Sequence, residues 1–408
     1  MRVPDARTAP DQAPAGLPAQ LRKDQATSLS KRARPLSPQA SRSRSTPGQH
    51  TLQEILSQAA IWPEAARELA RSGIAARLTA EAAPREPWLF VGCGSSYYLA
   101  QIAAAVWTKI LRAPCRALPA SEILFRPEET LGGDRAPQAV LLSRSGETTE
   151  LLRVAQLLRK RRSPLTLGAT CTAASPLESL CSMTLKLTTA DEKSTVMTRS
   201  FTSLLLAFER LAASLADERA LPGALERLPA QVQPWLEGTA AAIRAFGRKH
   251  KFSQCVFLGQ GWHYWLAQEA ALKVTEMSAT FAQAFHTLEF RHGPRAIAAR
   301  NVLVTFLTSE AAAAEEIPLV REMQALGART MVVVNRATPE LRRRSDLLVE
   351  LGLDVPEIAR LAVTAIPVQL LGCAIGLRKG LDPDRPRHLT RVVKLEEAAE
   401  VPVRKRRP

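Results

Sequence analysis

Three charged residues stand at helical spacing in the second half of the chain, and a histidine follows them closely. Glu269, Lys273 and Glu276 occupy positions i, i+4 and i+7, which places their side chains on one face of an α-helix. A solvated ion-pair face is the usual meaning of such a pattern. Here the predicted helix follows a Gly-x-Gly turn, and His292 comes next in a tight Gly-Pro turn that can present its imidazole to a ligand. These four residues are the candidates for acid–base chemistry.

Three hydroxyl side chains and a glycine form a second candidate site, in the first half of the chain. Ser143, Ser145 and Thr148, with Gly146 among them, follow an apolar run at 139–142 and open a predicted helix. Hydroxyls, a flexible glycine and a helix N-terminus together offer the donors and the dipole direction that suit a phosphate. An ordinary helix cap needs only one Ser or Thr with a Glu three positions later. No lysine follows in Gly-Lys-Ser/Thr order, so the pattern is not an ATP-type P-loop.

The two candidate sites belong to two copies of one sequence repeat. Residues 89–101 recur at 256–268, an offset of 167 residues. Each copy is typical of a short apolar strand, a Gly-x-Gly turn that brings the backbone close to a ligand, and a helix start whose free N–H groups suit an anion. A repeat of this length indicates a duplicated domain. Small hydroxyl residues follow the first turn and bulky residues the second, so we expect the first copy to hold phosphate and the second to supply the chemistry.

Short apolar strands alternate with helices in both halves, which is typical of βαβ units and a parallel sheet. The sequence therefore predicts an α/β fold of two tandem doubly wound, flavodoxin-like parallel-sheet domains. The expected strands are 88–91, 139–143, 165–169 and 183–187 in the first half, and 255–258, 302–307, 330–334 and 346–351 in the second. The expected helices between them are 97–111, 147–160 and 201–215, then 264–277, 312–326 and 356–371.

The two ends of the chain have compositions that cannot build a core. Residues 1–50 hold seven Pro and six Ser with little hydrophobic periodicity, which is typical of disorder. Of the net charge of +16, +6 lies in this leader and +4 in the last few residues, so the basic character does not indicate a nucleic-acid-binding face. The predicted organisation is a disordered leader at 1–50, a first domain at 51–220, a helical linker at 221–250, a second domain at 251–400 and a basic tail at 401–408.

The cysteines and the hydropathy of the chain indicate in which cellular compartment the protein is expected. The six cysteines are irregularly spaced and include no Cys-x-x-Cys pair, so neither a zinc site nor a disulfide framework is indicated. A reducing, cytoplasmic location fits this usage. No apolar run approaches the roughly 20 residues of a membrane helix, and we therefore expect no membrane partner.

Three motifs together give the chain a family resemblance. Residues 93–96 (Cys-Gly-Ser-Ser), 143–148 (Ser-Arg-Ser-Gly-Glu-Thr) and 192–202 (Glu-Lys-Ser-Thr-Val-Met-Thr-Arg-Ser-Phe-Thr) resemble the sugar isomerase (SIS) domain family. Their order resembles the isomerase half of glucosamine-6-phosphate synthase and its stand-alone deaminase/isomerase relatives. The resemblance implies that a sugar phosphate is held by Ser143, Arg144, Ser145 and Thr148, and its neighbouring hydroxyls by Ser95, Ser96 and Thr195.

The same resemblance assigns roles to the charged residues of the second half. It implies that Glu276 is a general base, that Lys273 is its helix partner and that Glu269 is a further acid. It also implies that His292 assists opening of the sugar ring, often from the neighbouring subunit, so a homodimer with a shared active site is expected. Moving a proton between carbons 1 and 2 of an open-chain sugar phosphate needs one carboxylate near both carbons and an acid or base at the ring oxygen. No metal or cofactor is required.

Two departures from the synthase pattern bear on the reaction. Residues 384–391 resemble the C-terminal active-site tail of the family, but Arg391 stands where the synthase has a lysine able to form a Schiff base. An arginine stays protonated and cannot take that role. The synthase also has a cysteine just after the initiator methionine, where this chain has Arg2. Deamination needs neither residue, because an amino sugar phosphate brings its own nitrogen.

The sequence therefore predicts an isomerising deaminase that converts glucosamine 6-phosphate, or a close relative such as galactosamine 6-phosphate, to a ketose phosphate and ammonia. A simple aldose–ketose isomerase and a glutamine–fructose-6-phosphate transaminase-like or ammonia-dependent synthase are the enzyme alternatives. A sugar-phosphate sensor without turnover is the alternative from another class. A sensor would need the hydroxyl cluster, but it has no use for Glu276 together with His292.

Overall fold

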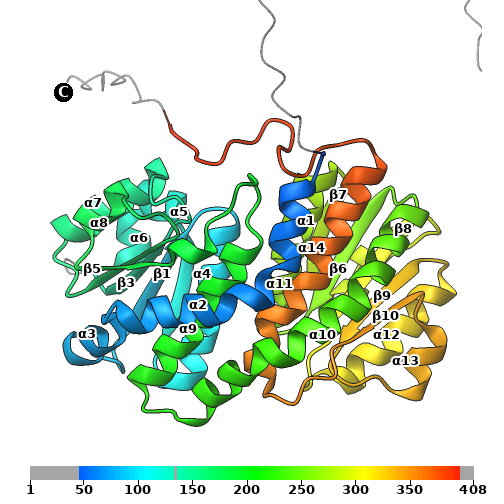
Figure 1. The fold of residues 1–408 in the computed structure, drawn as a ribbon, viewed down its shortest axis with the longest axis horizontal. Helices are drawn as coiled ribbons and strands as arrows, with labels where there is room; N and C mark the ends of the chain where they lie inside the picture. Colours follow the sequence, from blue (N-terminus) through cyan, green and yellow to red (C-terminus); the bar gives the residue numbers. More distant parts are fainter. Residues whose placement is uncertain (1–45, 133–135, 396–408) are drawn as a thin grey trace, which may run out of the picture. The chain divides into compact units, whose positions relative to one another are not determined.

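The computed structural model describes residues 46–132 and 136–395. The predicted basic tail and residues 1–45 of the predicted leader lie outside these residues, and the first helix, α1 (Gln49–Leu56), begins within the last part of that leader. The described chain contains two five-stranded parallel sheets with helices packed against them (Figure 1). The predicted α/β class with two tandem parallel-sheet domains is confirmed.

The first sheet has the strand order β2-β1-β3-β4-β5, and all its neighbouring strands are parallel. Four of its strands lie at the positions expected from the sequence. The fifth strand, β2, was not expected. This edge strand buries one of its five residues and includes an arginine and a proline, so it lacks the apolar run of the central strands. The strands are β1 (Trp88–Gly92), β2 (Cys115–Pro119), β3 (Gln138–Leu142), β4 (Thr166–Thr170) and β5 (Met183–Lys186).

The second sheet repeats this topology. Its order, β7-β6-β8-β9-β10, matches the first sheet strand for strand, and all its pairs are parallel. The edge strand that follows the first crossover is β7, and it too was not expected from the sequence, because none of its residues is fully buried. The strands are β6 (Gln254–Gly259), β7 (Phe281–His286), β8 (Val302–Leu307), β9 (Arg329–Val334) and β10 (Leu347–Glu350).

One hydrophobic core runs through both halves of the described chain. Helices of the first half and of the second contribute buried apolar side chains to the same cluster. The predicted linker is a single long helix, α10, and it takes part in this core. The helices concerned are α4 (Ser95–Leu111), α9 (Arg199–Leu215), α10 (Ala220–Lys249), α11 (Trp262–Ser278) and α14 (Leu361–Arg378).

The remaining elements cover the outer faces of the sheets and connect the strands. The longer ones carry apolar residues toward the sheets, as expected of amphipathic surface helices. They are α2 (Gln58–Arg71), α3 (Ile74–Glu81), α5 (Ala120–Phe125), α6 (Pro127–Leu131), α7 (Thr149–Lys160), α8 (Pro176–Leu180), α12 (Ala313–Ala325), α13 (Pro339–Arg344), and the 3-10 turns η1 (Thr188–Ala190), η2 (Glu289–Arg291), η3 (Pro294–Ile297) and η4 (Glu357–Arg360).

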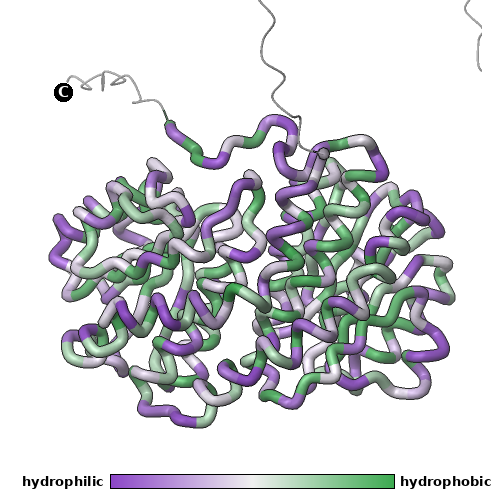
Figure 2. Tube along the Cα trace, in the orientation of Figure 1, coloured by the Kyte–Doolittle hydropathy of each residue, from purple (hydrophilic) through white to green (hydrophobic). Residues whose placement is uncertain are grey.

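One segment of the described chain, Glu357–Arg378, is long and apolar enough to pass for a membrane span by length and composition. Its apolar window is 94% buried inside the protein. A helix that is hydrophobic on all sides can serve as the core helix of a large domain. Figure 2 shows hydrophobic residues along α14 and the central strands of both sheets. The burial explains this composition without a membrane.

The two Gly-x-Gly turns have the same backbone geometry. Gly94 and Gly261 both have a φ of +55°, a region that favours glycine. Gly92 and Gly259 lie against the first turn of the helix that follows, and a Cβ at either position would come within 2.4 Å of a backbone carbonyl group. The sequence repeat is therefore a repeat of local structure.

Candidate active site

Glu269, Lys273 and Glu276 lie together on one face of α11, as their spacing predicts; we call them the α11 triad. Lys273 Nζ lies 3.5 Å from Glu269 Oε1 and donates a hydrogen bond to Glu276 Oε2. The side chains of Glu269 and Lys273 are each 1% exposed, whereas that of Glu276 is 19% exposed. Glu276 is therefore the member of the triad that a substrate can reach.

Burial sets the charge state of the triad. It raises the pKa of Glu269 to about 8, although the ammonium group of Lys273 opposes this rise. Burial alone would lower the pKa of Lys273, but the charges of Glu269 and Glu276 outweigh it and raise that pKa. Among the described residues neither carboxyl oxygen of Glu269 has a hydrogen-bond partner. Near neutral pH the triad thus holds an ammonium group beside two carboxyl groups, of which the buried one is largely protonated.

The start of helix α4, from the first copy of the repeat, lies against this face of α11. The Ser95 hydroxyl is near enough to Glu269 to lower the pKa of its carboxyl group. Burial, and then the charges of Glu269 and Glu276, raise the pKa of the Tyr98 phenol on the next turn. Ser95 and Ser96 are both 6% exposed. The two repeat copies therefore contribute to one site.

Ser143, Ser145 and Thr148 gather after β3 into a cluster that we call the hydroxyl cup. Ser143 Oγ lies 3.3 Å from Ser145 Oγ and 3.1 Å from Thr148 Oγ1. The backbone N–H of Gly146 donates to Ser143 Oγ at 3.0 Å. Gly146 has a φ of +65°, and a Cβ there would come within 2.4 Å of Ser175, so only glycine fits this turn. The cup opens helix α7, whose N-terminus adds a favourable dipole for an anion.

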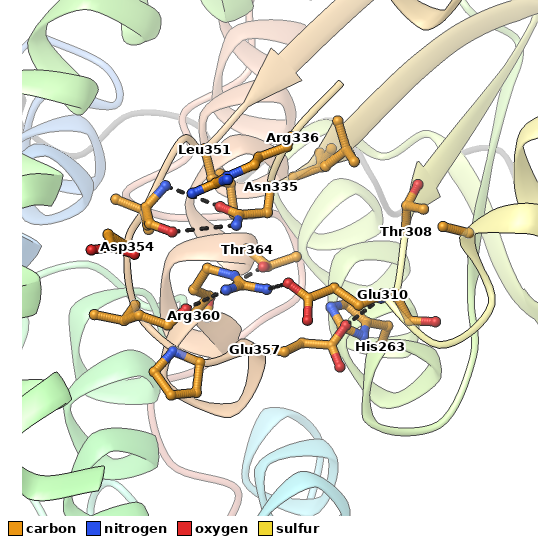
Figure 3. A pocket seen from close by; sticks show the side chains of 17 residues that line it. His263, Thr308, Glu310, Asn335, Arg336, Leu351, Asp354, Glu357, Arg360 and Thr364 are labelled. Atoms are coloured by element: carbon orange, nitrogen blue, oxygen red, sulfur yellow. Dashed lines mark hydrogen bonds and ion pairs between the residues drawn. The ribbon is translucent and has the colours of Figure 1, made fainter. Parts of the chain in front are cut away.

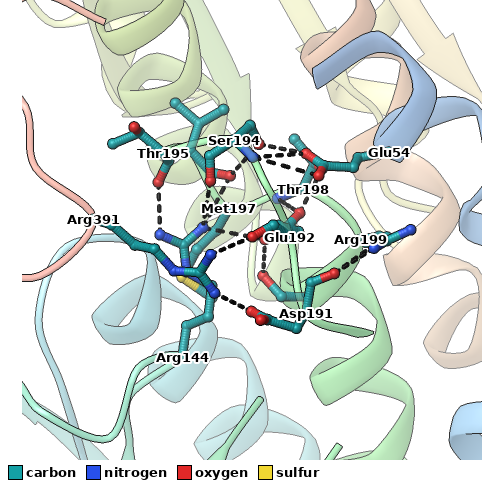
Figure 4. A network of polar contacts seen from close by, with 12 residues as sticks. Glu54, Arg144, Asp191, Glu192, Ser194, Thr195, Met197, Thr198, Arg199 and Arg391 are labelled. Atoms are coloured by element: carbon teal, nitrogen blue, oxygen red, sulfur yellow. Dashed lines mark hydrogen bonds and ion pairs between the residues drawn. The ribbon is translucent and has the colours of Figure 1, made fainter. Parts of the chain in front are cut away.

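Arg144 lies next to the cup but turns its guanidinium group away from it, into the loop between η1 and α9 (Figure 4). There it pairs with the fully buried carboxylate of Glu192 at 3.2 Å. It also donates to the carbonyl oxygens of Thr195 at 2.7 Å and Val196 at 3.1 Å. Its charge opposes protonation of Lys273, so this loop approaches the α11 triad. The contacts of Arg144 hold the loop that carries Thr195.

Arg391, which lies beyond the end of α14, joins the same network (Figure 4). It pairs with the Asp191 carboxylate and donates to the carbonyl oxygen of Glu192. The loop is thus held from one side by Arg144 and from the other by Arg391. In this structure the guanidinium group of Arg391 serves as a structural contact.

The residues after Arg391 run past the rim of the hydroxyl cup. The backbone N–H of Thr149 donates to the carbonyl oxygen of Val393 at 3.4 Å, and that of Leu395 donates to Thr149 Oγ1 at 3.1 Å. Lys394 Nζ pairs with Glu147 Oε2 at 3.0 Å. We call residues 384–395 the C-terminal segment; it connects the end of the second half to the cup of the first.

His292 stands apart from the other candidate residues. It is exposed and follows η2, whose Arg291 is tied to α12 by two hydrogen bonds to Glu322, at 3.2 and 2.7 Å. Among the described residues, no hydrogen bond or ion pair joins His292 to the α11 triad. The structure therefore places Ser95 beside the predicted triad and Arg144, next to the cup, near enough to act on Lys273, and it leaves His292 on the surface of this chain.

Glu192 is a site residue that the sequence pattern alone does not identify. Its buried carboxylate pairs with Arg144 and accepts hydrogen bonds of 2.6 Å from both the N–H and the hydroxyl of Thr198. Glu54 of α1 supports the same loop, because it accepts the Ser194 hydroxyl. The available signal was a glutamate at the head of a run of hydroxyl residues at 192–202.

Thiol and metal chemistry have little support in this part of the chain. All six cysteines are free. Burial raises the pKa of Cys93, beside the first Gly-x-Gly turn, to about 11, so this thiol stays neutral. Within residues 46–132 and 136–395, no group of three or more His, Cys, Asp or Glu side chains is placed to hold a metal ion.

Comparison with known families matches this architecture. The sequence model of the SIS domain matches residues 86–214 and 250–373, one match in each half. The chain belongs to the SIS domain family. The first match contains the hydroxyl cup and the second contains the α11 triad, so the two parts of the candidate site come from two SIS domains.

Curated relatives include glutamine–fructose-6-phosphate aminotransferases (isomerizing). The one from Methanothermobacter thermautotrophicus is 27% identical over 308 residues, and the one from Neisseria meningitidis is 30% identical over 322 residues. Each alignment covers 75% of this chain and 51% of the relative. This SIS chain thus spans about half the length of the curated relatives it matches.

Solved structures resemble the whole described SIS chain. A glucosamine-6-phosphate deaminase from Thermotoga maritima superposes with a TM-score of 0.70 and 29% identity, covering 85% of this chain and 100% of that one. The tagatose-6-phosphate ketose/aldose isomerase of Escherichia coli has a TM-score of 0.73 at 20% identity, covering 83% and 96%. The second likeness shows the fold alone.

Proposed function

We propose that this SIS protein is an isomerising deaminase of an amino sugar phosphate. Its substrate is glucosamine 6-phosphate or a close relative, and its products are a ketose 6-phosphate and ammonia. The observation that carries the proposal is the α11 triad beside the α4 serines, in a chain whose hydroxyl cup offers donors that suit a phosphate. A proton transfer on a phosphorylated sugar needs both parts, a base at carbons 1 and 2 and an anchor for the phosphate.

In this proposal the first SIS domain holds the substrate. The hydroxyls of the cup and the N-terminus of α7 bind the phosphate, because neutral donors and a helix dipole suit an anion. Arg144 keeps the neighbouring loop in place through Glu192, so it acts as a positioning residue. The residues that contact the substrate are Ser143, Ser145 and Thr148 at the phosphate and Ser95, Ser96 and Thr195 at the sugar hydroxyls.

The second SIS domain carries out the proton transfer. Glu276 takes the proton from carbon 2 of the ring-opened sugar, and the electron pair of that bond forms a double bond between carbons 1 and 2. The π electrons of the carbon 1 carbonyl move onto its oxygen, which takes a proton from water, and the enolamine results. The proton returns to carbon 1, which leaves an imine at carbon 2. Water adds to this imine and ammonia leaves. Lys273 orients the Glu276 carboxylate through their hydrogen bond, and Glu269 stays as a buried partner of Lys273.

Two observations favour deamination over the glutamine-dependent reaction. Arg391 is engaged with Asp191 and Glu192, and an arginine does not form a Schiff base with a ketose. The likeness to the Thermotoga maritima deaminase also extends over the full length of that structure. The curated relatives favour the second candidate, an aminotransferase-like synthase, and a simple aldose–ketose isomerase would use the same triad.

His292 takes its proposed role from a second copy of the chain. It is exposed and unconnected to the triad of its own chain, so its ring-opening role requires a homodimer in which it reaches the partner's site. In this proposal the imidazole is the acid or base at the ring oxygen. We propose a cytoplasmic homodimer with shared active sites.

The deciding experiment measures ammonia and fructose 6-phosphate released from glucosamine 6-phosphate. Glu276→Gln should lower kcat by about 10²–10⁴-fold, because it removes the base and keeps the shape of the side chain. Glu64→Gln is the matched control, since Glu64 is a surface carboxylate of α2 paired with Arg67 and Arg71. Unchanged activity in Glu276→Gln would refute the assignment of the base.

The same assay separates the alternative functions. Interconversion of glucose 6-phosphate and fructose 6-phosphate without ammonia release from any hexosamine phosphate would favour the simple isomerase. Formation of glucosamine 6-phosphate from fructose 6-phosphate and ammonium would favour the ammonia-dependent synthase. Saturable binding of these phosphates with no turnover would favour the sensor. Galactosamine 6-phosphate tested beside glucosamine 6-phosphate identifies the epimer.

A further inference from the structure

A cavity that is separate from the α11 triad and the hydroxyl cup lies in the second SIS domain (Figure 3). It has a volume of about 570 Å³, which is within the range of small-molecule sites. Its walls come from the residues that follow β8, β9 and β10 and from the first turn of α11. Ligands of open α/β sheets bind outside the carboxyl ends of the strands, where the strand order reverses. This cavity lies outside the carboxyl ends of β8, β9 and β10, and its His263 wall is beside the reversal between β6 and β8.

The cavity corresponds to the substrate site of the first domain through the repeat. His263 follows Ser96 by the repeat offset of 167 residues, so it holds in the second copy the place of a proposed sugar-binding serine. Thr308 is the first residue after β8, as Ser143 is the first after β3. Both His263 and Thr308 line the cavity. The second domain therefore has a cavity at the position that corresponds to the proposed substrate site of the first domain, but with different residues in its wall.

A buried group in the wall lacks a partner. His263 is 3% exposed, and its Nδ1 has no hydrogen-bond partner among the described residues. Burial, with the nearby charge of Arg360, lowers the pKa of His263 to about 3, so its ring is neutral. Buried polar atoms in native proteins are nearly always hydrogen-bonded. The neutral ring at the cavity wall therefore has an unused hydrogen-bonding atom.

The charges of the cavity disfavour a phosphate. Glu310 stands two residues after Thr308, where the first domain has the cup serine Ser145, and it pairs with Arg360. The loop after β8 thus contributes the carboxylate of its ion pair, whereas the loop after β3 contributes the guanidinium group of the pair between Arg144 and Glu192. An anionic ligand would meet a carboxylate where the cup offers a hydroxyl.

The other polar groups of the wall suit hydroxyls. Carboxylates of Asp354 and Glu357 can accept hydrogen bonds, and the guanidinium group of Arg336 can donate them. Arg336 is exposed and makes no hydrogen bond or ion pair among the described residues. The Thr308 hydroxyl can do both. A mixed set of donors and acceptors around a hollow of this size fits a compact polyhydroxylated molecule.

We propose that this cavity is a second ligand site, and that it binds an unphosphorylated sugar through His263, Thr308 and Arg336. The site is independent of the proposed catalytic reaction. It occupies the position in the second domain that corresponds, through the repeat, to the proposed substrate site of the first domain. The same fold thus carries a phosphosugar site in one domain and a neutral-sugar site in the other.

The test is calorimetric titration of the full chain with glucose, glucosamine and N-acetylglucosamine. At least one of them should bind saturably, and His263→Phe and Arg336→Ala should each weaken that binding about tenfold, the effect of losing one or two hydrogen bonds. Ser145→Ala, in the hydroxyl cup, is the matched control and should leave the affinity unchanged. Melting curves of each variant establish that it is folded. Because Arg336 is exposed, its variant keeps the test open even if His263→Phe does not fold.

Three outcomes would overturn the proposal. The first is the absence of saturable binding of all three sugars at millimolar concentration. The second is binding that is unchanged by Arg336→Ala but lost in Ser145→Ala, since the sugar would then occupy the first domain. The third is competition between the sugar and inorganic phosphate. None of these outcomes depends on turnover, so the catalytic proposal is tested separately.

Discussion

The protonated state of Glu269 has a consequence for stability that does not depend on the reaction. Its folded pKa of about 8 lies above the ordinary value of 4.5 because the carboxyl group is buried. Between these two values the native state keeps a proton that the unfolded chain releases. The free energy of unfolding therefore falls as pH rises through this window. Glu269→Gln replaces the group with a neutral one of the same shape and removes this loss.

The size of the effect follows from the shift. For each pH unit within the window, the titration of Glu269 lowers the free energy of unfolding of the wild type by about 1.4 kcal/mol. From about pH 5.5 to about pH 7.5 the advantage of Glu269→Gln over the wild type should therefore grow by about 3 kcal/mol. The side chain is 1% exposed, so solvent screening reduces this figure little. Partial ionisation beside Lys273 makes it an upper value.

The measurement is urea unfolding of both proteins at several pH values across that interval. The difference between them isolates Glu269, because other titrating groups are common to both. Glu322→Gln, which changes a surface carboxylate of α12 paired with Arg291, is the control and should follow the wild type. A difference between Glu269→Gln and the wild type that stays flat with pH would show that Glu269 is ionised throughout, and the account of the triad would then be wrong.

Three further changes have expected outcomes. Lys273→Met should lower the free energy of unfolding by about 1.5–3 kcal/mol, because it removes the charge-assisted hydrogen bond that Lys273 donates to the Glu276 carboxylate; urea unfolding measures this. Ser145→Ala should raise KM for the sugar phosphate about tenfold with little change in kcat, since it removes one hydroxyl of the phosphate anchor; steady-state kinetics separate the two. Gly146→Ala should cost about 1–3 kcal/mol of stability, because its φ is +65° and Ser175 occupies the space of a Cβ; thermal melting reports it.

Each of these has a result that would contradict it. A Lys273→Met protein as stable as the wild type would mean that the triad is held by packing alone. A Ser145→Ala protein with unchanged KM and reduced kcat would move that hydroxyl from the phosphate to the reacting carbons. An unchanged melting temperature in Gly146→Ala would mean that the turn can relax away from Ser175.

The central strands and long helices could be predicted from the sequence because their apolar residues follow the periods of strand and helix. The edge strands β2 and β7 could not. Each is only partly buried, so it lacks the continuous hydrophobic run of its central neighbours. Each edge strand forms because its backbone pairs with that of the neighbouring strand. The local sequence pattern of the edge strand does not show this pairing.

The candidate site divides in the same way. The α11 triad was predictable because helical spacing alone puts Glu269, Lys273 and Glu276 on one face. The direction of the Arg144 side chain was not, because it depends on the Glu192 loop, 48 residues further along the chain. The approach of Ser95 to Glu269 likewise depends on how two distant helices pack. Spacing within an element is visible in a sequence, whereas contacts between elements arise only on folding.

The core that runs through both SIS domains bears on how the two copies could exist apart. Side chains of α4 and α9 are buried in the same cluster as those of α10, α11 and α14, so either half alone would present an apolar face to water. A half-length fragment should therefore aggregate or pair with another fragment. In a pair of identical fragments every substitution would appear twice. Joining the copies in one chain lets each change separately, so that one carries the hydroxyl cup and the other carries the α11 triad.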